Sequence, residues 1–246
     1  RRILALALPI MGAMVSQSLL NMVDTAMVGV LGGDELAGVG LGGYLTFVAI
    51  SAVIGLGAGV QAMVARRKGE QDREHYAVPL NGGLILGVGF AVPLTLIFYF
   101  GAENLMQVLA RQEPVREVAT PYFQARVLCV GAVAMNFAFR GYWNGINRSA
   151  VYMRTLVATH ITNVAVSYVL IFGGLGVEPM GAVGAGIGTT VALYFGSLLY
   201  FLQTWEHASK NGFLRELPGR KVLGNILSVG LPNSAQQFLF ASSLIL

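Results

Sequence analysis

The feature that most constrains this chain is a long apolar run near its start that contains one acid. Residues 3–33 comprise 31 amino acids with a single charged side chain, Asp24. About 20 apolar residues suffice for a helix to cross a bilayer, so this run is long enough to span one. A carboxylate inside such a span costs about 2.5 to 3.5 kcal/mol on insertion scales. Because folding does not require that cost, we predict a functional role for Asp24.

Asp24 shares a helix face with two other polar side chains. Gln17, Asn21 and Asp24 are spaced i, i+4 and i+7, which places all three on one side of an α-helix. Of the 12 acidic residues in the chain, Asp24 is the only one well inside a predicted span. We therefore predict that this stripe supplies hydrogen bonds and a titratable group to a polar pocket.

The composition predicts an all-α integral membrane protein. Hydrophobic residues make up 55% of the chain and charged residues only 11%, whereas soluble domains carry about 25% charged residues. The apolar runs are long rather than short and alternating, which favours helices over a β-barrel. The predicted spans are residues 3–33, 36–65, 78–100, 118–139, 155–175, 180–205 and 222–246.

The basic residues predict how these spans are oriented. With the N-terminus in the cytoplasm, the inner loops carry 13 of the 16 Lys and Arg residues, the outer loops carry Arg111 and Arg116, and Arg126 lies within the fourth span. Cytoplasmic loops are enriched in Lys and Arg, so we expect a multi-pass protein of the cell inner membrane with a cytoplasmic N-terminus. The 13 residues are Arg1, Arg2, Arg66, Arg67, Lys68, Arg73, Arg140, Arg148, Arg154, Lys210, Arg215, Arg220 and Lys221.

Several classes of function are disfavoured. Short basic loops account for the net charge of +4, so we expect no nucleic-acid partner. One cysteine, Cys129, allows neither an internal disulfide nor a cysteine metal cluster. The G-x-G-x-x-G pattern at residues 38–43 lies inside an apolar run rather than after a strand, and no motif for nucleotide hydrolysis or nucleophilic catalysis is present. We therefore expect a protein that is not an enzyme and needs no cofactor.

Glycines and one proline mark places where helices approach closely or bend. The patterns Gly55-x-x-x-Gly59 and Gly184-x-x-x-Gly188 are typical of membrane helices that pack closely. Pro9 lies beyond the first turn of its span, where the missing backbone hydrogen bond predicts a kink.

The fifth and sixth spans carry further polar candidates. His160, Asn163 and Ser167 share one helix face, and Thr189 lies in the next span. These side chains either form interhelical hydrogen bonds, worth about 0.6 kcal/mol each, or complete a pocket around Asp24; for His160 a packing role is favoured. Arg126 is either an intramembrane charge or a snorkelling side chain near the start of its span.

The two ends of the chain resemble each other. ILALALP at residues 3–9 recurs as ILSVGLP at residues 226–232, an offset of 223 residues. Both copies follow basic residues and open a span, which is typical of the internal repeats of secondary transporters. Since the chain begins with Arg1 rather than Met and stops within an apolar run, we expect both ends to be cut from a longer protein.

An ordered set of short motifs extends over nearly the whole chain. These are LP at residues 8–9, NMVDTAMVG at 21–29, ARRKGEQD at 65–72, FRGYWNGINR at 139–148, Asn163, LIFG at 170–173 and GAVGAGIGT at 181–189. With this set the chain resembles the multidrug and toxic compound extrusion (MATE) family. The resemblance implies a twelve-helix transporter of two six-helix lobes that exchanges its substrate for Na⁺ or H⁺.

The resemblance also assigns roles to individual residues. It implies that Asp24 is the cation-coupling group, and a possible Na⁺ ligand, with Asn163 and Thr189 as pocket partners and Gln17 at a position that is often polar. Some members carry a second acid where this chain has Ser167, so coupling through two carboxylates of this lobe is in doubt.

The resemblance sets the domain boundaries and the function we expect. Residues 1–205 would form the first six-helix lobe, 206–221 a cytoplasmic linker and 222–246 part of the first helix of the second lobe. The expected function is cation-coupled export of amphipathic or cationic compounds, with the bilayer and the second lobe as partners. The alternative is a flippase of a lipid-linked saccharide, which would need a large cationic cavity.

Overall fold

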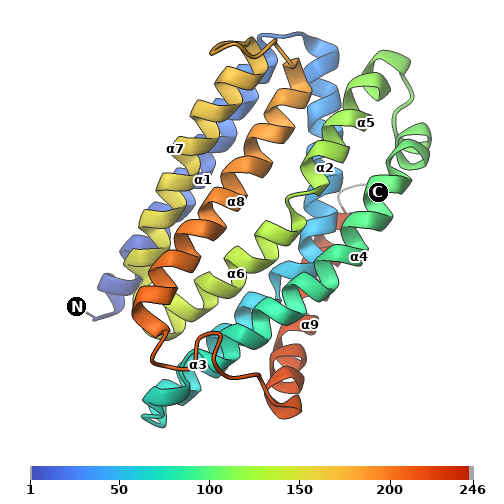
Figure 1. Ribbon diagram of the computed structural model, residues 1–246. Helices are drawn as coiled ribbons and strands as arrows, with labels where there is room; N and C mark the ends of the chain where they lie inside the picture. The colour runs from blue at the N-terminus through green and yellow to red at the C-terminus, as the bar shows by residue number, and fades with distance from the viewer. Residues whose placement is uncertain (1, 244–246) are drawn as a thin grey trace.

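The computed structural model describes residues 2–243, without the side chains of residues 2–7, 9 and 10. The described chain is helical apart from short loops (Figure 1). Its helices are α1 (Arg2–Gly29), α2 (Gly33–Ile54), α3 (Leu56–Gly69), the short 3₁₀ helix η1 (Arg73–His75), α4 (Val78–Leu109), α5 (Glu113–Val127), α6 (Val130–Gly145), α7 (Ser149–Phe172), α8 (Gly181–Ala208) and α9 (Arg220–Ser243). The predicted kink at Pro9 lies outside the fully described residues.

The helices form one bundle in which neighbours in space are often distant in sequence. Helix α7 packs against α1 and α8, and α5 packs against α2 and α8. On the other side, α6 lies against α3 and α4, while α9 covers α2 and α3 (Figure 1). The space enclosed by α1, α2 and α5–α8 is where the candidate site lies.

The fourth predicted span is wrong as a single helix. The structure divides this region into α5 and α6, which are bent by 44° at a break of two residues, Leu128 and Cys129. At the break the Cys129 amide donates to the Arg126 carbonyl, a tighter i to i+3 bond of 3.0 Å that interrupts the α-helical ladder. Counting this pair as one span, up to five helical stretches of the described chain are long and apolar enough to cross a membrane.

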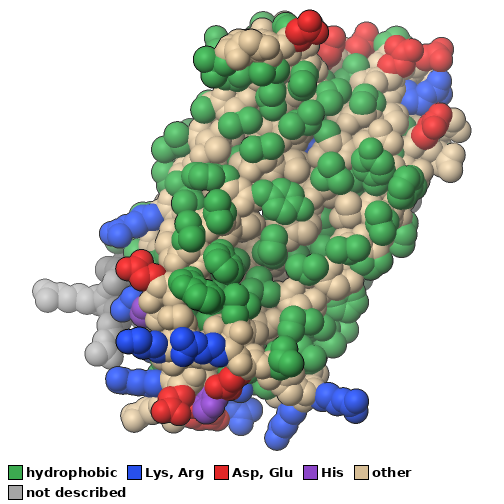
Figure 2. Space-filling model, viewed as in Figure 1, with side chains coloured by type: hydrophobic (Ala, Val, Ile, Leu, Met, Phe, Trp, Pro, Cys, Tyr) green, Lys and Arg blue, Asp and Glu red, His purple; other side chains and the backbone are tan. Residues whose placement is uncertain are grey.

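The surface matches a membrane environment. In Figure 2, most Lys and Arg side chains gather at one end of the molecule, acidic side chains lie at both ends, and apolar side chains cover the surface between them. Large apolar residues such as Ile97 and Phe100 on α4 are 68% and 76% exposed. Such a wide apolar band is expected where lipid covers the protein, so the predicted all-helical membrane fold is confirmed.

One buried amide holds the segment between α8 and α9 against the bundle. The Asn81 Nδ2 atom donates to the carbonyl oxygens of Gly212 and Glu216 at 2.8 and 2.9 Å, and the Leu214 amide donates to Asn81 Oδ1 at 3.1 Å. Asn81 is buried near the start of α4. Its side chain therefore satisfies three backbone groups of a segment that has no regular structure of its own.

We expect Asn81→Ala to release this segment. Three backbone groups lose their partner, which costs about 1 to 3 kcal/mol for each buried group left unpaired. Trypsin should then cleave faster after Lys210 and Arg215, as followed by mass spectrometry of the purified protein. Asn104→Ala, at an exposed position of the same helix, is the control, and equal cleavage rates in the two variants would contradict the assignment.

The close packing predicted for Gly55 is confirmed, and its partner is α9. A side chain at Gly55 would meet the Gly230 carbonyl and the backbone and hydroxyl of Ser234. The Gly55 amide also donates to Ser234 Oγ at 3.1 Å. The junction of α2 and α3 therefore has no space for a methyl group.

We expect Gly55→Ala to destabilise the bundle by about 1 to 3 kcal/mol, because overpacking moves backbone that has no flexible side chain to yield. The measurement is thermal unfolding of the purified protein in detergent. Gly40→Ala on α2, where an added methyl group meets nothing within 4 Å, should leave unfolding unchanged. If the two variants unfold alike, the contact with α9 does not stabilise the fold.

Candidate functional site

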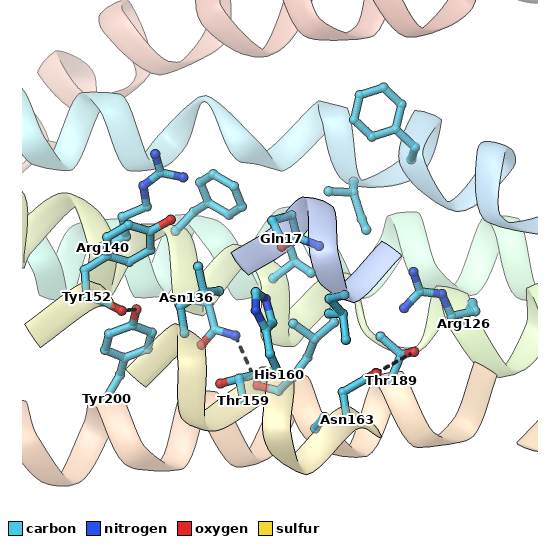
Figure 3. Close-up of a pocket in the computed structure, with 18 residues that line it drawn as sticks. Gln17, Arg126, Asn136, Arg140, Tyr152, Thr159, His160, Asn163, Thr189 and Tyr200 are labelled. Atoms are coloured by element: carbon cyan, nitrogen blue, oxygen red, sulfur yellow. Dashed lines mark hydrogen bonds between the residues drawn. The ribbon is translucent and has the colours of Figure 1, made fainter. Parts of the chain in front are cut away.

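A cavity of about 300 Å³ lies inside the bundle, lined by side chains from α1, α2, α5, α6, α7 and α8. Its wall combines apolar side chains with amides, hydroxyls, an imidazole and two guanidinium groups (Figure 3). This volume is at the lower end of those typical of small-molecule sites, and such mixed linings are common there.

Asn163 and Thr189 meet at one wall of the cavity. The Asn163 amide donates to Thr189 Oγ1 at 2.8 Å, and the Thr189 hydroxyl donates to the Ala185 carbonyl at 3.0 Å (Figure 3). Asn163 is buried, and its Oδ1 atom has no hydrogen-bond partner among the described residues. The pair thus presents an unpaired amide oxygen in the interior of the lobe.

Helix α1 contributes Gln17 to the cavity. The Gln17 amide donates to Asn21 Oδ1 at 3.2 Å, while Asn21 itself does not line the cavity. One residue earlier, the Ser16 hydroxyl lies 2.7 Å from His160 Nδ1 and joins α1 to α7. His160 is buried, which agrees with the predicted packing role, and its ring also lines the cavity.

Asp24 and Ser167 do not line this cavity. Asp24 is partly buried, and its Oδ1 atom has no hydrogen-bond partner in the described part of the chain. Ser167 is buried where α7 meets Gly188 of α8, so tightly that a methyl group at Gly188 would clash with it. Its position between two helix backbones is that of a packing residue, although its hydroxyl is also unpaired.

Two arginines of the cavity were not predicted as site residues. The prediction that Arg140 lies in a cytoplasmic loop is wrong, because α6 continues to Gly145 and Arg140 lies within this helix and lines the cavity. Its guanidinium carbon lies 4.7 Å from the ring centre of Tyr152 and 5.4 Å from that of Phe137. The sequence feature that could have indicated this position is Phe137, an aromatic residue three positions before Arg140. Arg126, whose role was left open, faces the same cavity near Thr189 (Figure 3).

We expect Thr189→Val to lower the thermal stability of the protein, because the buried Asn163 amide loses its acceptor. Interhelical hydrogen bonds in membranes average about 0.6 kcal/mol, with values up to about 1.7 kcal/mol, so the loss should be of that size. Thr189→Ser should restore it. The control is Thr162→Val, since the Thr162 hydroxyl bonds only a carbonyl of its own helix. Equal stability of Thr189→Val and wild type would contradict the role of this bond.

The fold and the cavity together indicate the class of protein to which this chain belongs. Long apolar helices that enclose a partly polar cavity, with polar and ionisable side chains facing inward, are typical of membrane transporters. The sequence model of the MatE family matches residues 9–169 of this chain. The chain therefore belongs to the MatE family, whose members are membrane transporters and not enzymes.

Individual proteins give the same assignment. The probable multidrug resistance protein NorM of Agrobacterium fabrum is 27% identical over 99% of this chain and 54% of its own length. An outward-facing multidrug resistance MATE family transporter of the MOP superfamily superposes with a TM-score of 0.86 at 27% identity, over 99% of this chain and 54% of its own. A MOP superfamily transporter from Pyrococcus furiosus, described as having a binding pocket of reverse polarity, gives 0.87 at 27% identity and the same coverage. The chain spans about half the length of the curated relatives it matches.

Proposed function

We propose that this chain is the first lobe of a cation-coupled antiporter that exports amphipathic or cationic compounds by alternating access. The relative from Agrobacterium fabrum is described as a probable multidrug resistance protein, and the structural neighbour as a multidrug resistance transporter. In this proposal residues 1–205 form the lobe, 206–221 the linker and 222–246 the beginning of a second lobe. The membrane is the cell inner membrane, with the N-terminus in the cytoplasm.

The observation that carries the proposal is the unpaired carboxylate oxygen of Asp24. A buried polar atom without a partner is costly, and a carboxylate in a membrane helix is costlier still. A bound cation or proton removes that cost. The unpaired Oδ1 of Asn163 is a second hard oxygen ligand of the kind that Na⁺ prefers, whereas a proton would need only Asp24.

Alternating access gives this site its coupling role. A cation that binds Asp24 more tightly in one conformation shifts the population toward that conformation, by no more than its difference in affinity between the two states. If substrate binds the other conformation better, the two ligands oppose each other, and entry of one drives release of the other.

The test uses the complete two-lobe protein in vesicles, with efflux of an amphipathic zwitterionic dye, which carries one cationic and one carboxylate group, followed under an imposed Na⁺ or H⁺ gradient. We expect one of the two gradients to drive efflux in wild type and Asp24→Asn to abolish it, because the amide keeps the shape but loses the charge. Asp34→Asn, an exposed position at the start of α2, is the matched control. Unchanged efflux in Asp24→Asn would place coupling elsewhere in the transporter.

A flippase of a lipid-linked saccharide is the alternative that shares this two-lobe plan. It requires a large cationic cavity, and two arginines do line the cavity of this lobe. Its volume of about 300 Å³ is small for a saccharide joined to a pyrophosphate. Failure of both gradients to drive dye efflux in wild type would favour this alternative.

A further inference from the structure

The cavity carries a charge pattern that the proposed function does not explain. Arg126 and Arg140 line it, and no Asp or Glu is found among its lining residues in the described part of the chain. In Figure 3 the two guanidinium groups lie toward opposite ends of the cavity. A wall with two cations and no anion disfavours a ligand that is simply a cation.

The two arginines differ in how their charge is satisfied. Arg140 lies against the faces of Tyr152 and Phe137, and such cation–π contacts stabilise a guanidinium group. For Arg126, the Nε and Nη1 atoms are buried and have no hydrogen-bond partner among the described residues. Two donors of one guanidinium group thus remain unpaired beside the cavity.

The acid on α1 does not supply the missing partner. Asp24 attracts Arg126 electrostatically, but the two side chains form no ion pair within 4.0 Å. Asp24 also does not line the cavity. Tyr122 and Asp24 both stabilise the charge of Arg126, yet its Nε and Nη1 donors still have no acceptor among the described residues. Buried donors without an acceptor are costly, so an oxyanion that enters the cavity would supply the acceptor that these two donors lack.

The remaining lining residues indicate the chemistry of the rest of such a ligand. Leu20, Phe47, Ile50 and Val133 supply apolar and aromatic surface, and Gln17 supplies an amide. An apolar body with one oxyanion group would match these surfaces, because a guanidinium fork binds a carboxylate through two parallel hydrogen bonds.

We propose that Arg126 binds the carboxylate of an amphipathic small molecule in this cavity and thereby selects for anionic or zwitterionic substrates. This inference rests on the proposed function, in that the cavity is taken to receive the exported compound. It narrows that function, since a substrate with a positive charge would also need a negative group at the Arg126 end.

The test is equilibrium binding to the purified two-lobe protein in phospholipid-free detergent, with radiolabelled 2-naphthoate and its neutral analogue 2-naphthamide as probes. We expect wild type to bind naphthoate at least about tenfold more tightly, as charge-assisted hydrogen bonds predict. Arg126→Gln should remove this preference while keeping naphthamide binding, which also shows that the variant is folded. Arg126→Lys should keep part of the preference, because it retains the charge but not the fork.

The matched control is Arg111→Gln, which removes an exposed arginine outside the helices and should keep the full preference. Equal affinity of the two probes for wild type, no binding of either, or a preference that persists in Arg126→Gln would overturn the proposal. Displacement of naphthoate by short-chain phosphatidylglycerol at concentrations below the dissociation constant of naphthoate would also overturn the proposal, because the oxyanion bound by Arg126 would then be that of a lipid. Gradient-driven dye efflux together with equal probe affinities would leave the antiporter standing and remove only this inference.

Discussion

The cost of leaving a buried polar group unpaired is the constraint on which this structure depends. Membrane helices satisfy their own backbone, so only side chains carry unmet hydrogen-bonding capacity. In this lobe Asp24, Arg126 and Asn163 each hold a buried atom without a partner among the described residues. A fold selected for stability alone would replace or pair these groups. We interpret them as groups whose partners arrive with the transported ligands.

The helical membrane fold was predictable because its signal is long and redundant. Runs such as residues 3–33 and 36–65 contain too little charge for any soluble structure. The break between α5 and α6 was not predictable, because Leu128 and Cys129 are as apolar as their neighbours and the turn is set by one backbone bond. Arg140 was not predicted to line the cavity because it directly follows the apolar run that ends at residue 139, whereas the helix itself continues to Gly145.

The candidate site was predictable only where a helix face carried several polar residues. Gln17 and Asn163 were predicted from their spacing and Thr189 from the family resemblance, and all three line the cavity, whereas Asp24 does not. The predicted coupling role of Asp24 stays a prediction. Asn81 was missed because its three partners come from a segment some 130 residues later, and contacts of that kind leave no periodicity in the sequence.

The central claim is that the cavity enclosed by α1, α2 and α5–α8 receives the ligand. Its most direct test is the rate at which a small maleimide labels Asn136→Cys, a cavity position, in a background in which Cys129→Ser removes the one cysteine of residues 1–246 and any other cysteine of the complete protein is also replaced by serine. We predict that saturating 2-naphthoate slows labelling at this position and leaves labelling of the exposed Asn104→Cys unchanged. An unchanged rate at Asn136→Cys, at a naphthoate concentration that saturates binding, would contradict the claim.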